Sequence, residues 1–109
     1  MPVYHKLVRD LIPEIVEKSG KVCISHTLDH DEYIAALNAK LDEELAEYHA
    51  ADSTHVLEEM ADLLEVLYAV AHAQGYSIEQ LETVRAEKAK QRGGFEKRIM
   101  LDEVIGSSH

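Results

Sequence analysis

The chain has 109 residues and a mass of 12.3 kDa, and 11 lysines and arginines against 21 aspartates and glutamates give it a formal charge of −10. A chain of this length closes one hydrophobic core, so we expect a single domain over residues 1–109. The negative charge disfavours a nucleic-acid polymer or an anionic membrane surface as partner, because both repel acidic proteins.

Turn-forming and capping residues predict a short N-terminal helix over residues 11–18. Pro13 suits the first turn of this helix, and Gly20 suits its end. Residues 21–28 alternate only weakly between apolar and polar positions, and we expect them to connect two helices. The apolar side of the first helix, which we expect to be buried, consists of Ile12, Ile15 and Val16.

A long second helix is predicted from about residue 30 to Tyr48, with Asp29 or Asp31 as its N-cap. Apolar residues recur along it at steps of three and four, which places them on one stripe. A cap among residues 52–54 then begins a third helix, which is predicted to end at Gln74. The stripe of the second helix consists of Ile34, Leu37, Leu41, Leu45 and Tyr48.

The third helix is apolar around most of its circumference, because Leu63, Val66 and Val70 extend the face that contains Leu57 and Leu64. A helix of this kind is covered on several sides. In a chain with only four predicted helices, this pattern predicts that a second subunit covers part of it. We therefore expect an oligomer with Val66 and Val70 in the interface.

A fourth helix is predicted from Ser77 to the pair Gly93-Gly94, and an irregular tail follows it. The fold class is therefore all-α. The start of the chain lacks the apolar core of a signal peptide, and the longest apolar run is too short to cross a membrane. Cys23, the one cysteine, has no partner within the chain, which is typical of a reducing compartment. These features predict a cytoplasmic protein.

Two acidic motifs with the same spacing lie on the second and third helices, EELAE at 43–47 and EEMAD at 58–62. Residues three apart are neighbours on a helix surface, so each motif presents a pair of carboxylates. The short interval between the motifs suits two antiparallel neighbouring helices, which would bring the pairs together. The two pairs are Glu44 with Glu47 and Glu59 with Asp62.

Four carboxylates around one space repel one another, and a hard divalent cation with oxygen ligands relieves this repulsion. We expect Mg²⁺, with Mn²⁺ as the alternative ion. A carboxylate di-iron site needs Glu-x-x-His motifs, and no glutamate here precedes a histidine by three positions. The competing interpretation is a solvated acidic face, and it suits Glu43 and Glu58, which point away from the two apolar stripes.

Basic residues are few and cluster near the start of the chain and at the end of the fourth helix. Lysine or arginine at a helix C-terminus has a structural explanation in the helix dipole. The functional interpretation is that some of these cations contact phosphates opposite a metal. The candidates near the start of the chain are Lys6 and Arg9, and those at or just after the end of the fourth helix are Lys88, Lys90, Arg92, Lys97 and Arg98.

The two acidic motifs, followed by the leucine-rich run LLEVL at 63–67, resemble the all-α nucleoside triphosphate pyrophosphatase superfamily, the MazG-like group. The start YHKLVRDLIPE at 4–14 and the segment KAKQRGGFEKRI at 88–99 resemble its phosphoribosyl-ATP pyrophosphohydrolase-like subgroup. The resemblance implies a helical bundle that forms a homodimer or homotetramer. It also implies Mg²⁺ on the acids, with Glu44, Glu47, Glu59 and Asp62 as metal-binding and catalytic residues. By position, Lys88 and Arg92 match basic residues that contact phosphate in related proteins, so the resemblance implies this role for them.

The expected function is Mg²⁺-dependent hydrolysis of a nucleoside triphosphate or related nucleotide between the α and β phosphates. The resemblance implies nucleoside monophosphate and pyrophosphate as products, and a house-cleaning role. The alternative is a non-catalytic helical oligomer that binds a nucleotide or a protein partner and whose acids serve only solubility.

Overall fold

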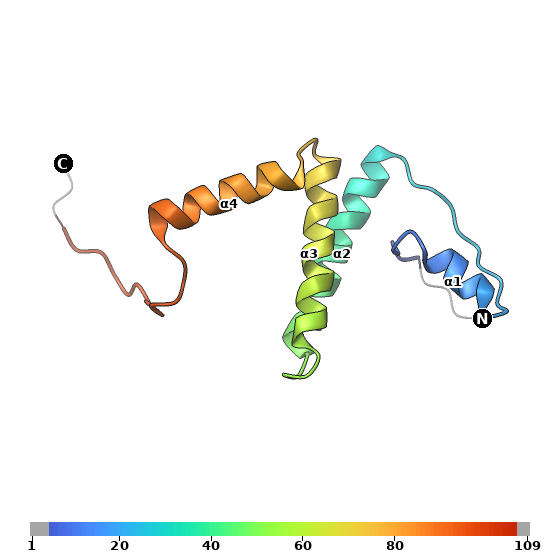
Figure 1. Ribbon diagram of the computed structural model, residues 1–109, viewed down its shortest axis with the longest axis horizontal. Coiled ribbons are helices and arrows are strands. Elements are labelled where there is room, and N and C mark those ends of the chain that lie inside the picture. Colours follow the sequence, from blue (N-terminus) through green and yellow to red (C-terminus); the bar gives the residue numbers. More distant parts are fainter. Residues whose placement is uncertain (1–4, 107–109) are drawn as a thin grey trace. The chain divides into compact units, whose positions relative to one another are not determined.

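The computed structural model describes residues 5–106. Within this range the chain forms four helices and no strand. They are α1 (Ile12–Lys18), α2 (His30–Ala50), α3 (Val56–Ala73) and α4 (Ile78–Arg92) (Figure 1). The predicted all-α class is confirmed. The chain divides into two compact units, Met1–Ile78 and Glu79–His109. A single domain over residues 1–109 stays a prediction.

Helix α1 forms where it was predicted, with Pro13 in its first turn and Gly20 beyond its end at a φ of 90°. Gly20 N donates a hydrogen bond to the carbonyl of Glu17 at 3.0 Å, which closes the last turn. The predicted burial of its apolar side is wrong: Ile15 is 57% exposed, and no α1 residue is buried. Its apolar side stays exposed because no other described helix packs against α1.

Helix α2 begins at the predicted cap. Asp29 accepts a hydrogen bond from the Glu32 backbone N at 2.8 Å, and Glu32 accepts one from the Asp29 backbone N at 3.1 Å. This reciprocal arrangement satisfies two backbone donors at the helix end and fixes where α2 starts. Helix α2 runs through Ala50, two residues beyond the predicted end.

The turn between α2 and α3 is organised by Asp52. Its Oδ1 accepts hydrogen bonds from the backbone N of Thr54 and of His55, both at 3.0 Å, and contacts His55 Nδ1 at 2.8 Å. A connection this short makes the two helices antiparallel neighbours. They lie side by side (Figure 1), and among the described helices they are the one pair that packs together.

The core of this hairpin is small. Leu37 of α2 is 3% exposed and Val66 of α3 is 9% exposed. The expectation that Val66 lies in a subunit interface is wrong, because this side chain is already buried within the hairpin. Val70 is half-buried.

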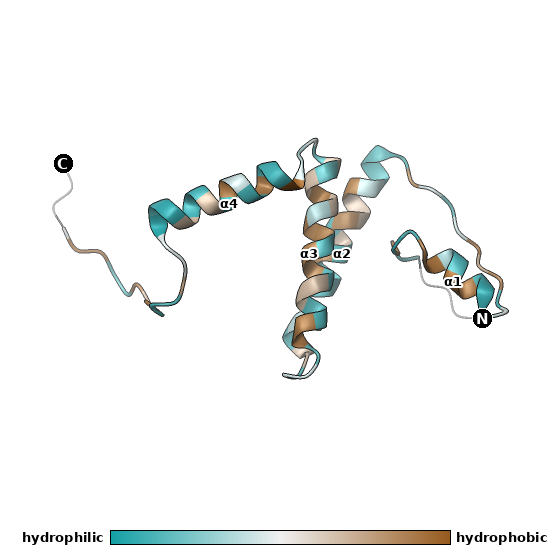
Figure 2. Cartoon of the chain, viewed as in Figure 1, coloured by the Kyte–Doolittle hydropathy of each residue, from teal (hydrophilic) through white to brown (hydrophobic). Residues whose placement is uncertain are grey.

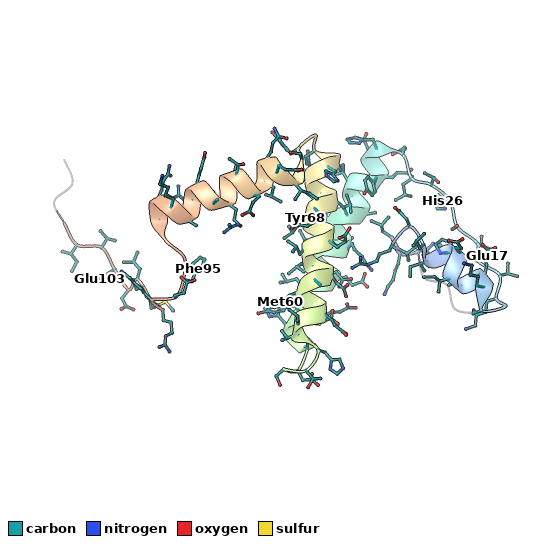
Figure 3. All side chains as sticks on the ribbon, viewed as in Figure 1. Glu17, His26, Met60, Tyr68, Phe95 and Glu103 are labelled. Carbon is teal, nitrogen blue, oxygen red and sulfur yellow. The ribbon has the colours of Figure 1, made fainter. Side chains whose placement is uncertain are left out.

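Another side of α3 is apolar and remains exposed. Much of α3 has the colour of hydrophobic residues in Figure 2. The exposed fraction is 73% for Leu57, 50% for Met60 and 45% for Leu64. Figure 3 shows Met60 projecting outward from the helix. These residues belong to a groove of about 530 Å³, which we call the α3 groove. It is lined by Tyr48, Leu57, Met60, Ala61, Leu63, Leu64 and Leu67.

The second unit consists of nearly all of α4 and the tail. Helix α4 is largely polar (Figure 2) and ends at Arg92. The next residue, Gly93, has a φ of 83°, and its backbone N donates a hydrogen bond to the Ala89 carbonyl at 2.8 Å. The described tail is irregular, as predicted, and its Phe95 is 95% exposed. None of the described helices is both long and apolar enough to span a bilayer.

Candidate metal centre

Three carboxylates from α2 and α3 converge where the helices pack together. One oxygen each of Glu44, Glu59 and Asp62 lies within 4.8 Å of the other two. Glu59 and Asp62 share one side of α3 because they are three residues apart. Glu44 approaches them from α2, since the tight turn at Asp52 folds α3 back along α2.

Two oxygens of this acidic cluster are buried without a hydrogen-bond partner, Glu44 Oε2 and Glu59 Oε2. The Glu44 residue is 6% exposed, and Glu59 is half-buried. A buried, unpartnered carboxylate oxygen is costly unless a cation or donor reaches it. Both oxygens are therefore positions where a cation between the helices would be stabilised.

The electrostatics of the cluster agree with its geometry. Burial raises the pKa of Glu44 above its ordinary value, and the negative charges of Glu47 and Asp62 raise it further, against the lowering effect of Lys40. Desolvation likewise raises the pKa of Glu59, with further contributions from Glu47 and Asp62. Each of these acids is thus harder to ionise, because the others are charged and water is excluded.

Glu47, the fourth predicted acid, lies at the border of the cluster. Its side chain is exposed, and it is not one of the three residues whose oxygens approach within 4.8 Å. It nevertheless lies close enough to raise the pKa of both Glu44 and Glu59. The structure therefore places all four predicted acids in one region, three of them in mutual contact range.

Lys40 is a part of this region that sequence reasoning missed. Its Nζ lies 3.5 Å from Glu44 Oε1 and 3.5 Å from Glu43 Oε1, and its side chain is 22% exposed. The available signal was its spacing, three and four residues before two glutamates on one helix. The interpretation of Glu43 as a solvated acid is wrong, because its side chain is only 28% exposed and pairs with Lys6 and Lys40. Glu58 is exposed, as that interpretation predicted.

Four of the predicted basic residues fall into two groups. Lys6 Nζ lies 3.0 Å from Glu43 Oε1, and Arg9 Nη2 donates a hydrogen bond to Asp62 Oδ1 at 2.7 Å. Lys88 and Arg92 belong to α4 in the second unit, where both are exposed. Their contact with phosphate stays a prediction.

The acidic cluster fits a hard divalent cation. Its three members offer oxygen ligands and no nitrogen or sulfur, which is the donor set that Mg²⁺ and Mn²⁺ prefer. The two unpartnered oxygens are the atoms that a cation would satisfy. A helical hairpin with converging carboxylates defines a class of all-α proteins suited to hold a divalent cation.

Comparison with known proteins narrows this class. Residues 3–90 match the family model described as phosphoribosyl-ATP pyrophosphohydrolase. The chain therefore belongs to this family, which is part of the MazG-like all-α nucleoside triphosphate pyrophosphatase superfamily, and the predicted resemblance is confirmed. The family is one of pyrophosphohydrolases that act on nucleotides.

The chain is also similar to a protein of Mycolicibacterium smegmatis described as uncharacterized, with 58% identity over 48 residues. The match covers 44% of this chain and 49% of that relative, so it spans about half of the relative's length. No solved structure matches the chain.

Proposed function

We propose that this protein hydrolyses a nucleoside triphosphate, or a related nucleotide, between its α and β phosphates. Water attacks the α phosphorus, the bond from that phosphorus to the bridging oxygen breaks, and pyrophosphate leaves with the bridging oxygen. The second product is the nucleoside monophosphate. Membership of the family supports the reaction, and the unpartnered oxygens of Glu44 and Glu59 are the observation that supports a metal-dependent form of it.

Glu44, Glu59 and Asp62 would hold the divalent cation, with Glu47 at the border as a fourth acid. We propose Mg²⁺, with Mn²⁺ as the alternative. When bound, the ion would offset phosphate charge and activate a water molecule. The protein itself supplies the charge that attracts this ion, because four acids lie in one region and Lys40 offsets only part of it.

The basic residues would neutralise the phosphates of the substrate. Arg9 contacts the acidic cluster by its ion pair with Asp62, and Lys6 forms an ion pair with Glu43. Lys88 and Arg92 are further candidates, from the last turns of α4. Charge on the departing pyrophosphate is offset best by donors already in place when that charge develops.

The family match favours this enzyme over the non-catalytic alternative. The exposed apolar residues of the α3 groove support a second copy of the chain as partner, in a homodimer or homotetramer. A house-cleaning role, in which surplus or damaged nucleotides are cleared, is part of the proposal.

The test is pyrophosphate release from a panel of nucleotides that includes phosphoribosyl-ATP, measured with and without Mg²⁺ or Mn²⁺. Glu59→Gln removes one charged ligand at nearly constant size, and we expect turnover to be lost. Glu58→Gln is the matched control, because Glu58 precedes Glu59 on α3 and is exposed. Equal turnover by the two variants, or no release from any nucleotide, would contradict the proposal.

A further inference from the structure

The segment before α1, residues 5–10, is held against the helical hairpin by two ion pairs. Lys6 pairs with Glu43 of α2 at 3.0 Å, and Arg9 pairs with Asp62 of α3 at 2.7 Å. These pairs link positions 37 and 53 residues apart in the sequence. Helix α1 itself packs against neither α2 nor α3, so side chains of the segment make the attachment.

The two ion pairs differ in their relation to the acidic cluster. Asp62 is one of the three residues whose oxygens converge, whereas Glu43 is not. A divalent cation in the cluster and the Arg9 guanidinium would therefore both be drawn to Asp62. They would also repel each other at this short range.

The Arg9–Asp62 pair is exposed enough to be exchanged. The side chains are 57% and 41% exposed, and water and salt weaken pairs of this kind. The Lys6–Glu43 pair has a more protected acid, because Glu43 is 28% exposed and also contacts Lys40.

We propose that Arg9 is an exchangeable counter-ion of the acidic cluster, which leaves Asp62 when a divalent cation binds and then binds the polyphosphate of the substrate. Lys6 and Glu43 keep the segment beside the hairpin during the exchange. The guanidinium suits both partners, since its planar donors fit carboxylate and phosphate oxygens alike. This inference rests on the proposed function, and it adds an order of events: the metal binds first and makes Arg9 available.

The exchange predicts opposite effects of one substitution on two ligands. Arg9→Gln removes the competitor of the metal, so Mn²⁺ alone should bind about two- to five-fold more tightly, the range expected for loss of an exposed ion pair. With Mn²⁺ in excess of both protein and tripolyphosphate, the same variant should bind the Mn²⁺ complex of inorganic tripolyphosphate at least about tenfold more weakly, because a charge-assisted contact is lost. Titration calorimetry measures both affinities in the full chain.

The matched control is Arg85→Gln. Arg85 also pairs with a carboxylate, donating from Nε to Glu82 Oε2 at 2.8 Å, but this pair lies within α4 and is not part of the acidic cluster. We expect this variant to leave both affinities unchanged. Circular dichroism of each variant verifies that the helices are retained.

A spectroscopic measurement follows the exchange directly. The guanidinium resonance of Arg9, identified by its absence in Arg9→Gln, should shift when Mg²⁺ is added to the wild-type protein. A second shift should follow when tripolyphosphate is added. A resonance that does not respond to Mg²⁺ would overturn the inference.

The outcomes separate this inference from the proposed function. If wild-type protein binds Mn²⁺ but Arg9→Gln binds it equally or less tightly, Arg9 only supports the structure and the inference fails alone. Unchanged tripolyphosphate affinity, or no tripolyphosphate binding by the wild-type protein, overturns the transfer to phosphate. If the wild-type protein binds no divalent cation, both the inference and the metal-dependent function fail.

Discussion

Replacing Glu44 by glutamine should change the stability of the metal-free and metal-bound protein in opposite directions. In the metal-free protein, burial and neighbouring acids disfavour the charged form of Glu44 more than Lys40 favours it, as its raised pKa indicates. A neutral amide of similar size relieves this repulsion and can donate to the remaining carboxylates. The metal-free Glu44→Gln variant should therefore melt at a higher temperature than the wild-type protein.

The magnitude with metal follows from binding to the folded state. At free Mg²⁺ about a hundred times its Kd, binding adds about 2.7 kcal/mol to the free energy of unfolding. Removal of a residue that supports a metal ligand can already weaken metal binding about a hundredfold. After such a loss, the same Mg²⁺ concentration adds only about 0.4 kcal/mol to the free energy of unfolding. The rise in melting temperature caused by Mg²⁺ should thus fall from roughly 10 °C to about 2 °C.

Thermal unfolding followed by circular dichroism, with and without Mg²⁺, measures both effects. Asp42→Asn is the matched control, because Asp42 is an exposed acid two residues earlier on the same helix. It removes the same charge without touching the acidic cluster. If the two variants shift the melting temperature alike in both conditions, Glu44 is not a metal ligand and the site is refuted.

Three further outcomes are expected. The pKa of Glu44 is raised in the folded protein. Below the pKa of the unfolded chain, near 4.5, Glu44 therefore does not destabilise the fold, and the destabilisation appears as pH rises through the pKa of the folded state. The difference in metal-free stability between Glu44→Gln and the wild-type protein should thus be larger at pH 8 than at pH 5. Lys40→Met should destabilise the metal-free protein by about 1 kcal/mol at pH 8, because Lys40 is the cation paired with buried Glu44. A double-mutant cycle should show a smaller loss in the Glu44→Gln background, where only the pair of Lys40 with Glu43 is left to lose. If the α3 groove joins two copies of the chain, Leu64→Asp should increase the monomer fraction measured by sedimentation velocity, because it places a charge in the interface. Leu101→Asp, in the exposed tail, is the control and should leave the monomer fraction unchanged. Equal sedimentation of both variants would contradict that interface.

Several features could be predicted because they depend on neighbours in the sequence. The start of α2 follows from Asp29 and Glu32, whose side chains bond to backbone within one turn. The carboxylate pair Glu59 and Asp62 follows from the helical repeat alone. The meeting of this pair with Glu44 was also predictable, because a short turn forces the next helix back along the first.

Other features depended on how α2 and α3 pack, which the sequence pattern of α3 alone left open. Because that helix is apolar over most of its circumference, its pattern did not reveal which side meets α2; packing buries Val66 and leaves Leu57 and Leu64 exposed. The pairing of Arg9 with Asp62 joins residues 53 positions apart, and no local periodicity encodes such a contact. The sequence by itself determined the helices and the presence of the acids, because hydrogen bonds and spacing within one turn are local. Only the tertiary structure decided which acids are buried and which cations balance them, because desolvation and charge pairing depend on distances across the packed hairpin.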